Sequence, residues 1–309
     1  MAHVHTFAGN PMDRADALRR DSIRLEALGR APDSRFLPMW KLNVAIAGET
    51  QACLKWLSVH EVASFQADLP TVFLGLLEGI AHFAVDVSVI ESPLVELDLG
   101  EDVKFEDCRT AAMTLDGAEA GIVAQTRSQL NWHRSHLYCG SCGTETQVMR
   151  GGHVRHCPGC ERDQFPRTDP VAIMLITHDD QCLLGQSAGR MAASSFYSAL
   201  AGFIDQGEAI EEAVRREVQE EAGIIVGEVR YHSSQPWPFP SSLMIGCHGQ
   251  ATTTDIVIDT TEMADVRWFD RATVIESLDG RRDDLRVPGA MAIAHHLIND
   301  WARGRVAPF

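Results

Sequence analysis

The segment 202–224 reads GFIDQGEAIEEAVRREVQEEAGI and constrains the fold of this chain more than any other stretch. We expect a helix over residues 209–222, after Gly207. At about 100° per residue, one arc of this helix carries Ile210, Ala213, Val214, Glu217, Glu220 and Glu221. A purely structural amphipathic helix would keep this arc apolar, so the three acids indicate a site.

Three carboxylates at positions i, i+3 and i+4 repel one another unless a cation lies among them. Carboxylate oxygens are ligands that suit Mg²⁺ or Mn²⁺. The helix alone leaves a second interpretation open, in which the acids form a solvated face.

The full spacing, Gly202-x5-Glu208-x7-Arg216-Glu217-x2-Glu220-Glu221, resembles the signature of the Nudix pyrophosphohydrolases. The resemblance implies that the Gly202–Phe203 loop leads into the helix and that Glu208 and Arg216 brace the loop against it. It implies catalytic, metal-binding roles on a diphosphate for Glu217, Glu220 and Glu221. It adds two metal ligands, Glu262 and the backbone carbonyl of Ala201; without it, Glu262 would be an ordinary surface acid.

A second motif, QPWPFPSS at 235–242, follows the helix. Its prolines impose an extended chain, and rigidly held aromatic rings can stack on a nucleotide base. An edge loop over the core, or a polyproline segment for a partner, would have the same composition. Read with Ser234, the string is similar to the stretch that distinguishes NADH pyrophosphatases among Nudix proteins. That similarity implies a nucleotide pocket lined by Gln235, Pro236, Trp237, Pro238, Phe239, Pro240, Ser241 and Ser242.

The same family resemblance implies further substrate contacts. Arg109 matches a substrate-contacting arginine, although a surface salt bridge is an equal alternative. Phe165 stands where some members have a tyrosine, so stacking could persist without the hydroxyl. Phe203 is a further candidate for base stacking, and Ala294 matches a late backbone contact. Gly152 replaces an acidic contact of some relatives, and we carry no role over to it.

Four of the eight cysteines form two Cys-x-x-Cys pairs: Cys139, Cys142, Cys157 and Cys160. Two such turns can supply a closed tetrahedral thiolate shell, the arrangement typical of a structural Zn²⁺ site. A redox pair or reduced buried thiols are the alternatives. The other four cysteines, Cys53, Cys108, Cys182 and Cys247, receive no function.

The composition fits a folded protein of 309 residues, with 45% hydrophobic and 23% charged residues. Its formal charge of −16 argues against a broad nucleic-acid-binding surface. The most apolar stretch, 71–90, is interrupted by charged residues and glycines, so we expect no membrane span. The N-terminus has no secretory pattern, and we expect a cytoplasmic protein.

We expect an α/β protein in three parts. Residues 1–130 form a mixed α/β domain, 131–167 a zinc ribbon, and 168–309 the catalytic domain, which by resemblance is a Nudix α/β/α sandwich with a mixed sheet. Runs at 42–47, 52–59, 71–77 and 80–90 alternate with turns in the first part; those at 52–59 and 71–77 predict strands, with a hairpin turn at Gly79. A capping box at Asp116 and Glu119 predicts a helix. Further strands are expected at 171–177, 183–185, 198–201, 229–233, 243–249 and 266–269, and a second flanking helix at 289–302.

These expectations together indicate a Nudix NAD(H) pyrophosphatase with Mg²⁺ or Mn²⁺ as catalytic and Zn²⁺ as structural metal. By resemblance it is a homodimer. Removal of the NAD cap from RNA 5′ ends is an alternative with the same chemistry. A nucleotide-sensing regulator is a distant third, because sensors of that type can lose acidic ligands that are all present here.

Overall fold

The structure is a computed structural model that describes residues 4–48, 51–63, 69–188 and 195–309. Its contacts group the chain into two compact units. The C-terminal unit comprises Asp169–Pro236 and Ser242–Phe309, with the chain up to His5. The N-terminal unit comprises Thr6–Thr168 and Trp237–Ser241. Each unit is described by itself below, and the three-part division predicted from the sequence stays a prediction.

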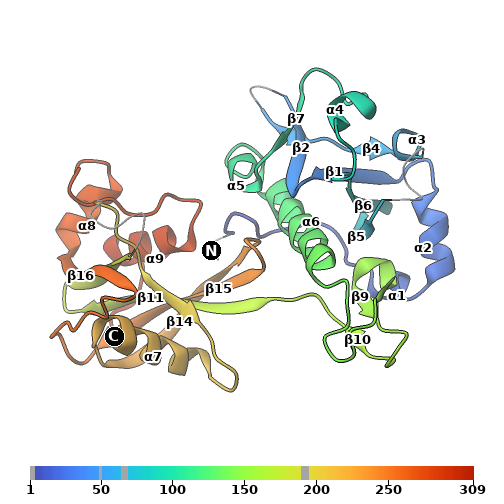
Figure 1. Cartoon of the computed structure of the whole chain (residues 1–309). Coiled ribbons are helices and arrows are strands. Elements are labelled where there is room, and N and C mark those ends of the chain that lie inside the picture. Colours follow the sequence, from blue (N-terminus) through green and yellow to red (C-terminus); the bar gives the residue numbers. More distant parts are fainter. Residues whose placement is uncertain (1–3, 49–50, 64–68, 189–194) are drawn as a thin grey trace. The chain divides into compact units, whose positions relative to one another are not determined.

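The C-terminal unit is built on a six-stranded mixed sheet (Figure 1). Its path runs β14-β15-β11-β12-β16, and β13 also pairs with β11; β11 and β15 are parallel, and β12 and β13 are antiparallel to β11. The strands are β11 (Asp169–His178), β12 (Gln181–Ser187), β13 (Leu200–Phe203), β14 (Val226–Trp237), β15 (Ser242–Ala251) and β16 (Met263–Asp270). The helices are α7 (Ile210–Ala222), α8 (Arg271–Leu278) and α9 (Ile293–Ala302).

Strand β11 explains the layers of this unit, because successive side chains of a strand point to opposite faces. Ala172, Met174 and Ile176 pack in one buried cluster with the apolar residues of α7. Ile173 and Leu175 pack in a second cluster with the apolar residues of α9. The sheet therefore lies between helices on both faces, which confirms the predicted α/β/α sandwich with a mixed sheet.

The N-terminal unit holds a seven-stranded mixed sheet with the path β3-β2-β1-β6-β5; β4 pairs with β1 and β7 with β2. Its strands are β1 (Arg35–Trp40), β2 (Asn43–Ala47), β3 (Cys53–Leu54), β4 (Leu57–Ser58), β5 (Thr71–Leu77), β6 (Ile80–Asp86) and β7 (Val103–Glu106). Its helices are α1 (Asp16–Arg19), α2 (Ser22–Gly29), α3 (Val59–Val62), α4 (Pro93–Glu96), α5 (Cys108–Ala111) and α6 (Gly117–Ser135).

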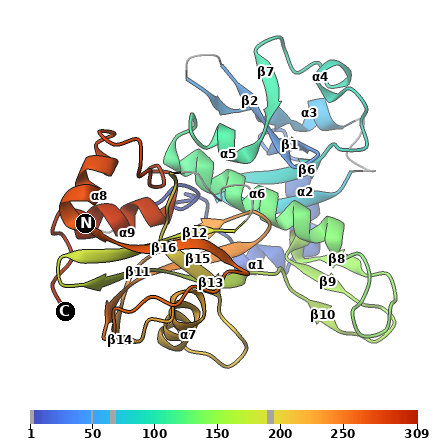
Figure 2. The same ribbon diagram turned by 60° about the vertical axis from the view of Figure 1, so that its left-hand side comes forward.

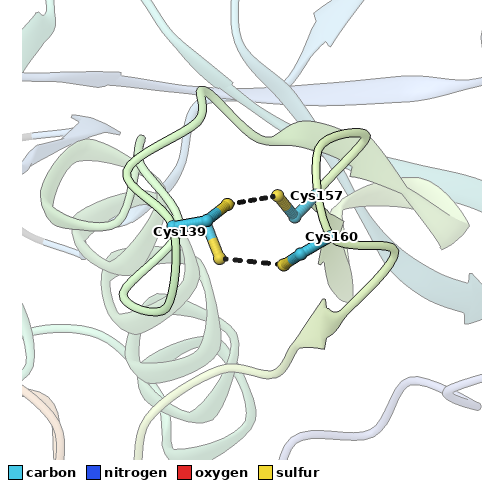
Figure 3. Close-up of side chains that lie close together, drawn as sticks. Cys139, Cys157 and Cys160 are labelled. Atoms are coloured by element: carbon cyan, nitrogen blue, oxygen red, sulfur yellow. Dashed lines mark hydrogen bonds between the residues drawn. The ribbon is translucent and has the colours of Figure 1, made fainter.

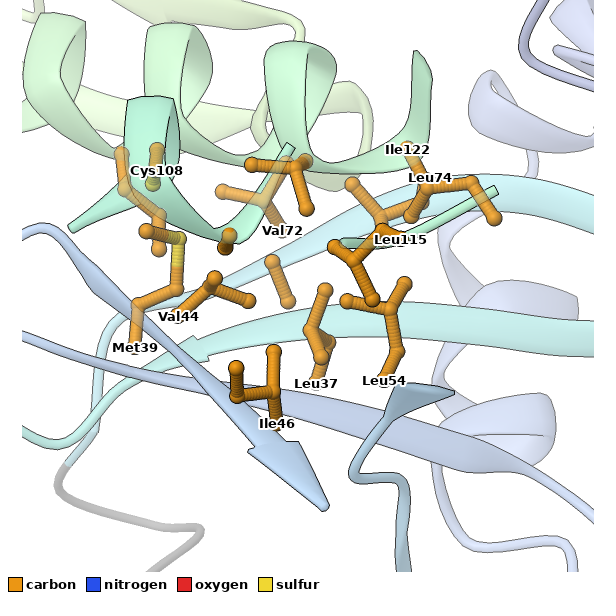
Figure 4. Close-up of a cluster of buried hydrophobic side chains, with 14 of the residues drawn as sticks. Leu37, Met39, Val44, Ile46, Leu54, Val72, Leu74, Cys108, Leu115 and Ile122 are labelled. Carbon is orange, nitrogen blue, oxygen red and sulfur yellow. The ribbon is translucent and has the colours of Figure 1, made fainter. Parts of the chain in front are cut away.

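Helix α6 covers one face of this sheet and closes its core (Figure 4). Ile122 of the helix packs in one cluster with Leu37, Val72 and Leu74 of the strands. The predicted hairpin between β5 and β6 is present, and both of its turn residues, Glu78 and Gly79, have positive φ. This backbone conformation suits glycine at the second position.

The zinc ribbon, also in the N-terminal unit, is a small sheet in the order β10-β9-β8. It contains β8 (Gln147–Met149), the 3-10 turn η1 (Arg150–Gly152), β9 (Val154–His156) and β10 (Asp163–Gln164). Figure 2 shows these strands following α6. No helix in the described parts of the chain is both long and apolar enough to cross a membrane.

Several sequence predictions need correction. The run 52–59 is two short strands, β3 and β4, because β3 pairs with β2 and β4 with β1. Half of the predicted capping box is wrong: Asp116 accepts from the backbone N–H of Glu119, but the Glu119 carboxylate accepts from Leu54 N–H. The predicted helix at 289–302 begins only at Ile293, and α8 has no counterpart among the predictions.

Candidate functional site

Helix α7 carries the predicted carboxylates between two glycine-dependent turns. Gly207 (φ +93°) lies in the loop before the helix, and Gly223 (φ +71°) caps its C-terminus in the left-handed conformation. A Cβ on Gly223 would lie 2.8 Å from Cβ of Val257. Both glycines thus meet backbone conformations that other residues rarely adopt.

Arg216 of α7 links the helix to the loop that precedes it. All five of its N–H groups donate hydrogen bonds. Nε and Nη2 donate to the two oxygens of Glu208 at 2.6 and 2.8 Å, and Nη2 donates to the Phe203 carbonyl at 2.9 Å. Nη1 donates to Glu217 at 2.8 Å and to Glu220 at 3.0 Å. The hydrogen bonds from Arg216 lower the pKa of Glu208 to about 2. These bonds match the bracing that the resemblance implied.

Glu221 is the most perturbed acid of the helix. Its side chain is only 7% exposed, and its Oε2 is buried without a hydrogen-bond partner. Burial first, and then the charges of Glu217, Glu262 and Glu220, raise the pKa of Glu221 to about 8. A buried carboxylate without a partner is costly, and a bound cation would remove that cost.

Glu217 lies against β13, where only a glycine leaves room for it. A Cβ on Gly202 would fall 1.8–2.2 Å from the carboxylate atoms of Glu217. Burial raises the pKa of Glu217 despite the bond from Arg216. Gly202 is therefore needed because the Glu217 carboxylate approaches its backbone closely. The two turn glycines, in contrast, are needed for their backbone conformation.

These acids provide a donor set that fits a divalent cation, because the buried Oε2 atom of Glu221 is an unused oxygen ligand beside other acids. Glu262 is exposed, and its charge acts on both Glu217 and Glu221. Ala201 is exposed in β13 and pairs with Ile173. Within the described residues, the ligand atoms of these acids do not all lie within 4.8 Å of one another.

The segment predicted to bind nucleotide forms the turn between β14 and β15, and its tip packs within the N-terminal unit. Ring centroids of Trp237 and Phe239 lie 6.0 and 5.6 Å from that of Phe7. The guanidinium carbon of Arg109 lies 3.8 Å from the Phe239 ring centroid. The predicted residues Arg109, Trp237 and Phe239 are thus brought together, and Arg109 makes a cation–π contact here.

The other residues predicted to contact the substrate differ in how far their side chains are buried. Gln235 is fully buried, and its amide bonds the Met291 carbonyl and Ile293 N–H, so its side chain fixes the start of α9. Ala294 is also buried. Phe165 and Phe203 are exposed by 62% and 59%, which leaves their rings accessible. The roles of all these residues in binding stay predictions.

Arg127 was missed by the sequence analysis. It lies on α6, donates to the Pro238 carbonyl, and places its guanidinium carbon 4.4 Å from the Phe239 ring centroid. The sequence carries no signal for this contact, because one arginine in a helix is most often a solvated residue.

The four paired cysteines converge within the ribbon (Figure 3). Their sulfur atoms all lie within 4.8 Å of one another; Cys139 and Cys160 are 3.7 Å apart, and Cys142 and Cys157 are 3.4 Å apart. Backbone N–H groups of Ser141 and Cys142 lower the pKa of Cys139 to about 6. Four convergent sulfurs within reach of one ion fit a structural Zn²⁺.

The comparisons with known families cover the chain in three successive parts. Residues 33–132 match the NADH pyrophosphatase-like rudimentary NUDIX domain, 134–165 the NADH pyrophosphatase zinc ribbon domain, and 166–287 the NUDIX domain. A solved NUDIX hydrolase from Nitrosomonas europaea is 20% identical, covers 54% of this chain and 91% of its own, and has a TM-score of 0.45.

Several curated proteins are similar over most of the chain. The human NAD-capped RNA hydrolase NUDT12 is 46% identical over 96% of this chain and 73% of its own length. The NAD-capped RNA hydrolase NudC of Mycobacterium bovis is 33% identical over 94% and 92%. The mouse mitochondrial NAD(P)H pyrophosphatase NUDT13 is 34% identical over 73% and 69%. This chain belongs to the NADH pyrophosphatase family of the Nudix hydrolases.

Proposed function

We propose that this chain hydrolyses the pyrophosphate bond of NAD(H) with Mg²⁺ or Mn²⁺, giving nicotinamide mononucleotide and AMP. The observation that carries the proposal is the buried, unpartnered carboxylate oxygen of Glu221 within a cluster of acids. Cleavage of a diphosphate needs positive charge beside its oxygens, and this cluster is suited to supply it through divalent ions.

In this proposal Glu217, Glu220 and Glu221 hold the metal ions, with Glu262 and the Ala201 carbonyl as further ligands. Divalent ions bound there would neutralise the diphosphate and make a water molecule more acidic. One glutamate, among these or further away, accepts the proton of the attacking water. Arg216 orients Glu217 and Glu220 through its hydrogen bonds.

For substrate recognition we propose stacking on the aromatic rings at the hairpin tip. Trp237 and Phe239 already pack edge-on against Phe7, and such preorganisation would lower the ordering entropy lost on binding. Arg109 contacts the same group and adds positive charge for a phosphate. The proposed contacts are Arg109, Phe165, Phe203, Gln235, Pro236, Trp237, Pro238, Phe239, Pro240, Ser241, Ser242 and Ala294.

Removal of an NAD cap from RNA is the second candidate, since the chemistry is the same and two of the relatives named above are called NAD-capped RNA hydrolases. Residues 131–167 carry five arginines against three acids, whereas the whole chain carries a charge of −16.

We also propose a homodimer and a cytoplasmic location. Sedimentation of the purified protein tests the first, and imaging of a tagged chain tests the second.

The test is to incubate purified, zinc-loaded protein with NADH and either metal and to identify the products by mass. Reduced nicotinamide mononucleotide and AMP are expected, with no product when the divalent ion is omitted. Glu221→Gln should lower turnover by about 10² or more, whereas Glu211→Gln, an exposed acid of the same helix, should leave it unchanged. Equal turnover by the two variants would refute the assignment, and parallel assays on NAD-capped RNA rank the two substrates.

A further inference from the structure

The N-terminal unit contains a cavity of about 400 Å³ that the proposed reaction does not use. Apolar side chains make most of its wall: Pro70, Val72, Leu130, Leu137 and Val148. It lies where β5, the end of α6 and the ribbon strands β8 and β9 meet within this unit. Its volume falls within the range of small-molecule sites.

A buried arginine lines this cavity. Arg155 of β9 is only 4% exposed. Its Nε and Nη2 donate to Oγ1 and the carbonyl of Thr146 at 2.7 and 3.0 Å, and its Nη1 lies 3.0 Å from Nδ1 of His133. His133 Nε2 lies 2.8 Å from the Gly152 carbonyl, so His133 donates there and accepts from Arg155. Every acceptor of Arg155 is therefore neutral.

Among the residues that the structure describes, no acid hydrogen-bonds to Arg155; burial lowers the pKa of its guanidinium, and the charge of Glu145 offsets only part of this. A guanidinium carries five N–H groups, and three are used here, which leaves two. A buried cation is usually paired with an acid, since desolvation is costly otherwise. An anion with an apolar body would satisfy both the two N–H groups and the walls.

We propose that this cavity binds a small organic anion, a carboxylate or a phosphate monoester on an apolar or aromatic body, with Arg155 as its charged partner. Asp86, also buried, lines the cavity and accepts from Ser88. It favours a ligand with an N–H or O–H donor away from its anionic end. Two sources share this chemistry: free aromatic acids and nucleoside monophosphates.

The pairing of β8 with β9 offers a test that leaves Arg155 in place. Val148 is the registered partner of Arg155, so the two side chains lie on one face. Val148 is half exposed, so a polar residue is tolerated there. Val148→Asp supplies Arg155 with an internal carboxylate that competes with the ligand, and Val148→Asn is its neutral match.

The experiment titrates the full-length, zinc-loaded protein by calorimetry with 2-naphthoate, its neutral analogue 2-naphthamide, AMP and inorganic phosphate. We expect saturable one-to-one binding of naphthoate or AMP, about tenfold or more tighter than naphthamide. Val148→Asp should weaken that binding about tenfold, and Val148→Asn less than about threefold. Naphthoate binding alone identifies an aromatic acid as the ligand class, and AMP binding lost in Val148→Asp identifies a nucleotide.

Other results overturn the proposal. They are equal affinity for naphthoate and naphthamide, equal binding by the two Val148 variants, binding of inorganic phosphate alone, or no saturable binding of any probe. Arg155→Met should also abolish binding, and zinc content measured on that variant separates loss of the charge from loss of the ribbon fold. NADH hydrolysis should be unchanged in both Val148 variants, so this test and that of the proposed reaction fail independently.

Discussion

Replacing Glu221 by glutamine should stabilise the protein while removing its activity. The pKa of this buried carboxyl is raised to about 8 from 4.5. Below pH 4.5 the group is protonated in both folded and unfolded chains, and it costs nothing. As pH rises from 4.5 to 8 the unfolded chain ionises first, so the folded state loses stability relative to it.

The size of the effect follows from the two pKa values. Between pH 5 and pH 8 the penalty grows by about 3.5 kcal/mol, at 1.36 kcal/mol per pKa unit. Relaxation of the site lowers this ceiling, and we expect about 1–2 kcal/mol. Glu221→Gln removes the penalty, so its advantage over the wild type should be small at pH 5 and largest at pH 8.

The assay is urea unfolding of zinc-loaded wild type and variant at both pH values, without added Mg²⁺, followed by a signal from the C-terminal unit. Adding Mg²⁺ at pH 8 should stabilise the wild type more than the variant, because the ion binds the ionised form. Glu211→Gln serves as the control. A stability difference that does not change with pH, or a variant less stable than the wild type at pH 8, would refute the reasoning.

Three further predictions concern separate contacts. Gly202→Ala places a Cβ within 2.2 Å of the Glu217 carboxylate and should lower kcat about 10²-fold, whereas Gly289→Ala, with open space around it, should not; equal kcat in both would contradict the close-approach argument. Cys157→Ser should lose the zinc and destabilise the N-terminal unit, and exposed Cys53→Ser should keep it, as metal analysis and thermal unfolding would report; full zinc in Cys157→Ser would contradict the site. Phe239→Ala should raise KM for NADH about tenfold with kcat changed less than about threefold, while exposed Tyr231→Ala should change neither; an unchanged KM would remove the stacking role.

The sequence predicted those features that depend on neighbours along the chain. The helix expected at 209–222 is α7, which begins one residue later. The hairpin at Gly79 was predicted for the same reason, because a two-residue turn selects its residues locally.

Features that depend on distant contacts escaped prediction. Arg127 meets Phe239 across more than a hundred residues, and nothing near either residue in the sequence announces it. The Glu119 carboxylate accepts from Leu54 instead of completing its own capping box, because a strand edge supplies a competing donor. The buried amide of Gln235 likewise bonds α9, which its motif did not suggest.

Because of Arg216, the catalytic divalent ion and the structural zinc should differ in how tightly the protein holds them. Its guanidinium is a built-in counter-ion for Glu217 and Glu220, so any ion that enters must compete with it. This competition weakens the binding of the divalent ion. The fraction of sites that hold an ion therefore follows the concentration of free ion in solution. Zinc bound by the four converging ribbon cysteines should instead survive desalting, whereas magnesium or manganese should have to be added again before the protein turns over.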